Sequence, residues 1–150
     1  QLDEYDDEGM TPLTHACQEC HPDVAAWLVN QGACLLTPSA MGLTPMHYIC
    51  LNGLESLLPY ITADNVNLSS STGLSLLHCA SYRGHVHVLE HLLSNSADVN
   101  TTDDNGSTPL HCAASNNHVD AVRCLLSYDA IVNRRDIHGM TPFLSACAAG

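Results

Sequence analysis

One short pattern recurs along this chain at almost constant spacing, and it constrains the fold more than any other feature. Each copy begins with a glycine and one variable residue, and a tetrapeptide related to Thr-Pro-Leu-His follows. The glycines are Gly9, Gly42, Gly73, Gly106 and Gly139, which stand 33, 31, 33 and 33 residues apart. A period of this length predicts a stack of similar structural units, because each unit buries its apolar face only against its neighbours.

Within each copy, the order of residue types predicts a short helix followed by a longer one. A threonine or serine such as Thr108 is suited to cap a helix, and Pro109 fits the first turn, where no amide donor is needed. Small residues such as Ala113 let this helix approach its neighbours closely. After a break at Gly53, Gly84 or Asn117, a second segment has apolar residues at helical spacing. These are Val86, Val88, Leu89, Leu92 and Leu93 in the third copy, and Val119, Val122, Leu125 and Leu126 in the fourth.

The unit of Thr108-Pro109-Leu110-His111, with a closing Ala97-Asp98-Val99-Asn100 in the copy before it, resembles the ankyrin repeat. The resemblance covers nearly the whole chain. It implies an all-α solenoid of stacked helix-turn-helix units with projecting β-hairpin loops, and a role in binding other proteins. We expect a single array over 1–150, with repeats at about 6–38, 39–69, 70–102, 103–135 and a partial one at 136–150.

Three departures from the pattern lead to separate expectations. The second copy is two residues short and has Pro59 where its second helix should run, so we expect that helix to be shortened or kinked. The first copy has Cys20 where a glycine is usual. The fifth copy stops at Gly150, and neither end has a polar capping repeat, so we expect an excerpt of a longer array or an array without its caps.

Charge and hydropathy exclude several classes of partner. The net charge is −12, there is no lysine, and the strong cations are Arg83, Arg123, Arg134 and Arg135. Such a chain repels a phosphate backbone, so we expect no nucleic-acid binding. No apolar run is long enough to span a membrane, so we expect no direct membrane insertion. Several cysteines recur at the small packing position, which favours the reducing cytoplasm or nucleus.

Motifs for catalysis or cofactors have a better explanation in the repeat. Cys17-Gln18-Glu19-Cys20-His21 matches a haem-attachment pattern or half of a zinc site, but Cys17 occupies the small packing position. His87 and His91 stand four apart and form either a metal pair or, as we favour, a solvated helical face. There is no nucleophile elbow and no phosphate-binding loop. We therefore expect no enzyme activity, no cofactor and no metal.

Asn100 is a possible modification site. Leu92, Asp98, Val99 and Asn100 resemble the pattern on which asparaginyl hydroxylases act in ankyrin domains. A structural loop asparagine is the favoured interpretation.

The resemblance implies that a partner contacts the hairpin tips and the inner, short helices. The position after each repeat glycine is expected to be exposed, yet it is large and apolar in four of five copies, at Met10, Leu43, Leu74 and Met140. We predict a groove with an apolar floor and an acidic N-terminal end, which accepts a protein or peptide with apolar anchors and basic flanks. The alternative is that these residues pack against neighbouring hairpins. The candidate partner-binding residues are Asp7, Glu8, Met10, Met41, Leu43, Leu51, Leu74, Tyr82, Asp104, Asn105, His138 and Met140.

The leading functional interpretation is therefore a non-enzymatic protein–protein interaction module. An alternative is a regulatory or substrate-recruiting segment of a larger enzyme, ubiquitin ligase or ion channel. A mechanical spacer is a third interpretation.

Overall fold

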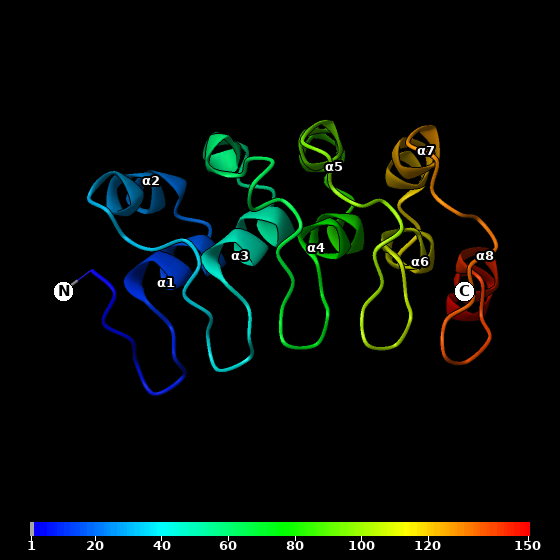
Figure 1. The fold of residues 1–150 in the computed structure, drawn as a ribbon, viewed down its shortest axis with the longest axis horizontal. Coiled ribbons are helices and arrows are strands. Elements are labelled where there is room, and N and C mark those ends of the chain that lie inside the picture. Colours follow the sequence, from blue (N-terminus) through cyan, green and yellow to red (C-terminus); the bar gives the residue numbers. More distant parts are fainter. Residues whose placement is uncertain (1) are drawn as a thin grey trace.

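Two rows of short helices make up the computed structural model, which describes residues 2–150 (Figure 1). The inner row consists of α1 (Pro12–Gln18), α3 (Pro45–Asn52), α4 (Leu76–Arg83), α6 (Pro109–Ser115) and α8 (Pro142–Ala149). The outer row consists of α2 (Pro22–Asn30), the 3-10 helix η1 (Glu55–Tyr60), α5 (Val86–Ser94) and α7 (Val119–Ser127). Long loops project from the inner row, and the two ends of the chain lie at opposite ends of the stack (Figure 1). The predicted all-α solenoid is confirmed.

The inner helices begin as the sequence pattern predicts. The side chain of Thr108 accepts a hydrogen bond from the His111 amide, and the Thr108 amide in turn donates to the His111 ring at 3.1 Å. The same reciprocal cap occurs at Thr44 and Ser75. Each cap satisfies amide groups that have no partner inside the helix. The tetrapeptide therefore fixes where each inner helix starts.

Pro59 has the predicted effect on the second repeat. Its outer segment is η1, a six-residue 3-10 helix with Pro59 inside it, whereas α5 and α7 are nine-residue α-helices. Proline lacks an amide donor and its ring collides with the carbonyl of the fourth preceding residue, which prevents a regular α-helix. Leu57 and Leu58 on η1 are nevertheless buried, so the segment still covers the core.

The break between inner and outer helices depends on a left-handed backbone conformation. Gly53 and Gly84 end α3 and α4 with φ values of 65° and 72°. A Cβ atom on Gly84 would lie 2.6 Å from the ring of His118, so glycine is required by packing as well as by conformation. Cys20 takes the same conformation in the first repeat, with φ of 58°.

The projecting loops are closed turns that contain little regular β-structure. Within residues 2–150, β-pairing is limited to one isolated antiparallel bridge, between Ser69 and Ser75. Each tip is closed by a backbone bond such as that from the Asp103 amide to the Ser107 carbonyl, at 3.0 Å. Neighbouring loops are joined as well, for example by the Asp104 amide and the Thr72 carbonyl at 3.1 Å. The loops therefore form a connected row along one edge of the stack.

Candidate partner-binding groove

An apolar cavity of about 280 Å³ lies on the inner row, between the second, third and fourth repeats. Its lining comes from α3, α4 and α6 and from the residues that follow Gly42 and Gly73. It includes four residues that the sequence predicted: Leu43, Leu51, Leu74 and Tyr82. The other lining residues are His47, His78, Cys79 and Cys112. We call this the apolar cavity.

The histidines of the apolar cavity are fully engaged in hydrogen bonds. Nδ1 of His78 accepts from the Ser75 amide at 3.1 Å, and its Nε2 donates to the Ser107 carbonyl of the next repeat at 2.9 Å. His47 makes the equivalent bonds to the Thr44 amide and the Leu74 carbonyl. Burial lowers the pKa of both imidazoles, so they are held neutral. Neither ring has a free nitrogen to act as a base or to bind a metal.

The cysteines of the apolar cavity have low nucleophilic reactivity. Burial raises the pKa of Cys79 and of Cys112 to about 12 in each case. Since the thiolate is the reactive form, both side chains behave as small apolar groups at neutral pH. Neither residue was among the predicted partner-binding residues. Both stand directly after the tetrapeptide histidine, at the position of Tyr48 in the second repeat, and this shared register was the available signal.

A second hollow of about 380 Å³ lies between the first and second repeats. It brings together four more predicted residues: Asp7, Glu8, Met10 and Met41. Gln18 of α1, Tyr48 of α3, Ser39 and Ala40 complete its lining. We call this the acidic pocket, because two carboxylates stand at its rim.

The predicted exposure of Met10 is wrong. The Met10 side chain is only 5% exposed to solvent, and it belongs to the hydrophobic core. The second loop closes over the first, where the Ala40 amide donates to the Glu8 carbonyl at 2.9 Å. Leu43 and Leu74 are partly buried against the core and Met140 is also partly buried, so these positions do not form a fully exposed stripe. Packing against neighbouring loops therefore accounts for part of the row.

The remaining predicted residues lie at the tips of later loops and line neither hollow. Asp104, Asn105 and His138 are exposed, and Met140 is partly buried. The residues that shape these tips are different ones. Oδ1 of Asp136 accepts from the His138 amide at 2.8 Å and from the Met140 amide at 2.9 Å. Asp6 and Asp103 make the same pair of bonds in their loops, and none of the three aspartates was among the predicted residues.

Asn100 has a structural role in the loop between repeats. Its Oδ1 accepts from the Ile131 amide at 2.8 Å, and Asn67 makes the equivalent bond to the Asp98 amide at 2.9 Å. This geometry agrees with the favoured interpretation of a structural asparagine. Hydroxylation at Asn100 stays a prediction.

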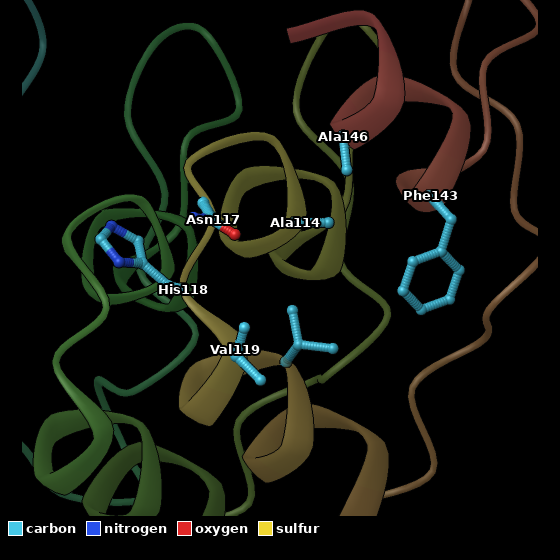
Figure 2. Close-up of a pocket in the computed structure, with 7 residues that line it drawn as sticks. Ala114, Asn117, His118, Val119, Phe143 and Ala146 are labelled. Atoms are coloured by element: carbon cyan, nitrogen blue, oxygen red, sulfur yellow. The ribbon is translucent and has the colours of Figure 1, made fainter. Parts of the chain in front are cut away.

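Another apolar hollow, of about 230 Å³, lies at the C-terminal end of the stack. Figure 2 shows Phe143 and Ala146 on α8 around the same space as Ala114 on α6 and Val119 on α7. In the other repeats, an outer helix packs beside the inner one at this position (Figure 1). This hollow is therefore explained by the repeat geometry and is not assigned to a partner.

Neither a metal-ligand cluster nor a membrane-spanning helix is present in residues 2–150. No group of three or more His, Cys, Asp or Glu side chains in that range is placed to hold a metal ion. Cys17 is buried and burial raises its pKa to about 12, while Cys20 is exposed. His91 donates to the Ile61 carbonyl at 2.8 Å instead of pairing with His87. Within the same range, the helices are too short or too polar to cross a bilayer.

Comparison with known proteins gives a consistent result. A family model described as ankyrin repeats in three copies matches residues 1–70, 34–103 and 77–150. The chain is 32% identical over 95 residues to the tyrosine-protein kinase HTK16 of Hydra vulgaris, covering 61% of this chain and 12% of that protein. It is 30% identical over 86 residues to the protein fem-1 homolog A-like of Mus musculus, covering 57% of this chain and 13% of that protein. The matched segments are thus a small part of both relatives.

Proposed function

This chain belongs to the ankyrin-repeat family, and we propose that it binds a protein or peptide partner by taking an apolar side chain into the apolar cavity. Ankyrin repeats are protein-interaction modules, and their fold is generally non-catalytic. The single observation that carries the proposal is the convergence of Leu43, Leu51, Leu74 and Tyr82 on one hollow of the inner row.

The size and the chemistry of the apolar cavity support a side chain as its occupant. Small-molecule sites are usually about 300–1,000 Å³ with several convergent polar groups. The apolar cavity has about 280 Å³, and the ring nitrogens of His47 and His78 are already bonded to backbone. An apolar side chain would lose no hydrogen bond on entering this hollow, whereas a polar one would.

The same features support the absence of catalysis. A nucleophile needs a neighbouring base or a lowered pKa. The pKa of Cys79 and that of Cys112 are raised, and the imidazoles beside them have no free nitrogen. The groups of this cavity therefore favour binding over chemistry.

Tyr82 offers the sharpest test of the proposal. Its side chain is 52% exposed, so Tyr82→Ala removes a contact surface with little effect on the core. Leu43 and Leu74 are poorer targets, because both pack against the core and a charged residue there would also destabilise the fold. Tyr128→Ala, at the C-cap of outer helix α7 and 39% exposed, is the matched control.

The measurement is a quantitative affinity capture from cell extract with the wild-type chain and both variants. A buried aromatic anchor at an interface contributes about 2 kcal/mol or more, so we expect Tyr82→Ala to weaken capture of specific partners about tenfold or more. Tyr128→Ala should retain them. Equal capture by both variants would place the site elsewhere, and a wild-type chain that captures nothing specific would contradict the proposal.

A second proposal is a regulatory or substrate-recruiting segment within a larger enzyme, ubiquitin ligase or ion channel. It is supported by the relatives, in which the matched segment is 12% and 13% of the protein. A full-length sequence with a catalytic or transmembrane domain beside the array would favour this proposal.

A further inference from the structure

Within residues 2–150, no salt bridge neutralises the negative charge of Asp7 and Glu8 at the acidic pocket. Asp7 and Glu8 are exposed at its rim, and none of the four arginines is among its lining residues. The neighbouring Asp6 is different, because its carboxylate accepts from two amides and lies 2.7 Å from His15 Nε2. The loop is thus held in shape by one carboxylate while two others face the pocket.

A second observation comes from the polar groups inside the pocket. Ser39 is 7% exposed, and its buried Oγ has no hydrogen-bond partner within residues 2–150. The Tyr48 phenol lies close by without a hydrogen bond of good geometry. Burial raises the pKa of this phenol, its interaction with the Ser39 side chain lowers it, and the nearby Glu8 carboxylate raises it. A buried hydroxyl without a well-formed hydrogen bond is costly, so a donor from a partner would stabilise it.

The pocket therefore offers acceptors to a cationic donor. Carboxylates only accept hydrogen bonds, and hydroxyl oxygens such as Ser39 Oγ have acceptor lone pairs. A lysine or arginine side chain supplies positive charge and several N–H donors, and its aliphatic stem can pack beside the exposed Met41. A carboxylate or phosphate would be repelled by Asp7 and Glu8.

The acidic pocket and the apolar cavity are neighbours along one groove. Inner helix α3 contributes Tyr48 to the acidic pocket and Leu51 to the apolar cavity. The second loop contributes Met41 to the first and Leu43 to the second. A single partner segment that lies across α3 would therefore reach both hollows.

We propose that the acidic pocket binds a lysine or arginine side chain of the same partner segment whose apolar side chain enters the apolar cavity. The inference rests on the proposed function and adds the direction and the spacing of the bound segment. Packed helices lie roughly 8–10 Å apart, and because α3 lines both hollows we take one such step as the offset between them. The cation and the apolar anchor should thus be about three residues apart in an extended segment, or six to seven apart in a helix.

The experiment selects binders from a random linear peptide library displayed on phage. Selection is run on the wild-type chain and on Asp7→Asn/Glu8→Gln, in which exposed carboxylates become neutral amides of similar size. Glu55→Gln/Asp64→Asn is the matched control, since it changes the net charge equally at exposed positions on η1 and the loop after it. Equal helical circular dichroism confirms that all three proteins are folded.

On wild type and control, selected peptides should carry lysine or arginine at the stated spacing from an apolar residue. On Asp7→Asn/Glu8→Gln, the apolar residue should persist and the basic one should disappear. The leading wild-type peptide should bind this variant about five- to tenfold more weakly at 0.15 M salt, with less than about a twofold change for the control.

Two outcomes would overturn the inference. In the first, basic residues are enriched equally on all three proteins. In the second, they are lost equally from both charge variants, which would indicate general attraction to an acidic chain. Selection on Tyr82→Ala separates this failure from failure of the proposed function. If the apolar residue also persists on Tyr82→Ala, the apolar cavity is not the anchor site and both proposals fall. If it is lost there while basic residues stay on Asp7→Asn/Glu8→Gln, only the inference falls.

Discussion

At the scale of single residues, histidines connect the repeats. Nδ1 of His47 and of His78 accepts a backbone amide of its own repeat, and Nε2 donates to a carbonyl of the next. His85 and His118 reach back in the other direction, with Nε2 donating to the carbonyls of Leu51 and Tyr82 at 3.0 Å. Each of the Nε2 bonds joins adjacent units, so the side chains contribute to stacking and not to chemistry.

The pH dependence of stability follows from His47 and His78. Burial lowers the pKa of both below the ordinary value of 6.5, so the unfolded chain takes up protons first as the pH falls. Their contribution to stability is complete above about pH 6.5 and is lost as the pH falls toward the lowered values. Urea unfolding should thus give a lower free energy at pH 5.5 than at pH 7.5, by at most about 1.4 kcal/mol per pH unit for each imidazole. Equal values at both pH values would contradict the neutral-imidazole assignment.

Asp103 should matter to stability, while its neighbour Asp104 should not. Asp103 Oδ1 accepts from the Asn105 and Ser107 amides, each at 2.9 Å. Asp103→Ala removes both bonds in a partly exposed loop, so we expect a loss of about 1–2 kcal/mol in the free energy of unfolding. Asp104→Ala is the control within the same loop, with an expected change within about 0.5 kcal/mol. Asp103→Asn retains the acceptor oxygen and should restore most of the loss; identical unfolding curves for both alanine variants would contradict the assignment.

At the scale of helices, the stack depends on how each inner helix ends. Gly53 and Gly84 let the chain reverse in the left-handed conformation, and the imidazole of the following repeat lies against each glycine. The outer row is less regular than the inner one, because Pro59 converts one of its helices to a 3-10 helix. The second repeat still stacks, because its inner helix α3 is capped and buried like inner helices α4 and α6.

Alanine substitutions at two glycines with positive φ distinguish the energetic cost of backbone conformation from that of steric packing. A Cβ on Gly84 would lie 2.6 Å from His118, whereas one on Gly32 would meet nothing within 4 Å. Gly32→Ala should therefore cost about 1–2 kcal/mol through its left-handed backbone alone. Gly84→Ala should cost at least about 1 kcal/mol more, because the ring of His118 must move away from its bond to the Tyr82 carbonyl. Thermal unfolding of both variants measures the difference, and equal losses would mean that the ring adapts without cost.

At the scale of the whole molecule, each repeat contacts only its neighbours, so stability is distributed along the stack. The central inner helix α4 is buried at six positions, from Leu76 to Ser81, whereas α8 buries only Pro142 among its residues. Phe143 and Leu144 on α8 are 46% and 49% exposed. The core is therefore continuous, and its side chains are more completely buried at the centre of the stack than at α8.

Amide hydrogen exchange should reveal this gradient directly. Local opening free energies follow buried contact density, so the amides of α8 should exchange at least about tenfold faster than those of α4. Mass spectrometry of peptides from the two helices, at one pH and temperature, measures the ratio. Exchange in α8 as slow as in α4 would show that the stack opens only as a whole.

Much of this protein was predictable from its sequence because the fold repeats a local pattern. Thr108, Pro109 and His111 each act within one turn of helix, so their roles follow from residue type and spacing. Pro59 also acts locally, and its effect on the outer helix was predicted correctly. Leu43, Leu51, Leu74 and Tyr82 were identified as groove residues because their register placed them on the inner row, and they do line one hollow.

Tertiary structure alone decided which of these residues remain accessible. Met10 and Leu43 occupy the same position in the repeat, yet Met10 is buried and Leu43 is only partly so. Packing between repeats, and not residue type, decides whether this position is exposed. The division of the groove into an apolar cavity and an acidic pocket has the same cause. The sequence determined the repeating unit and the direction in which each side chain points, and the contacts between units determined which side chains are left for a partner.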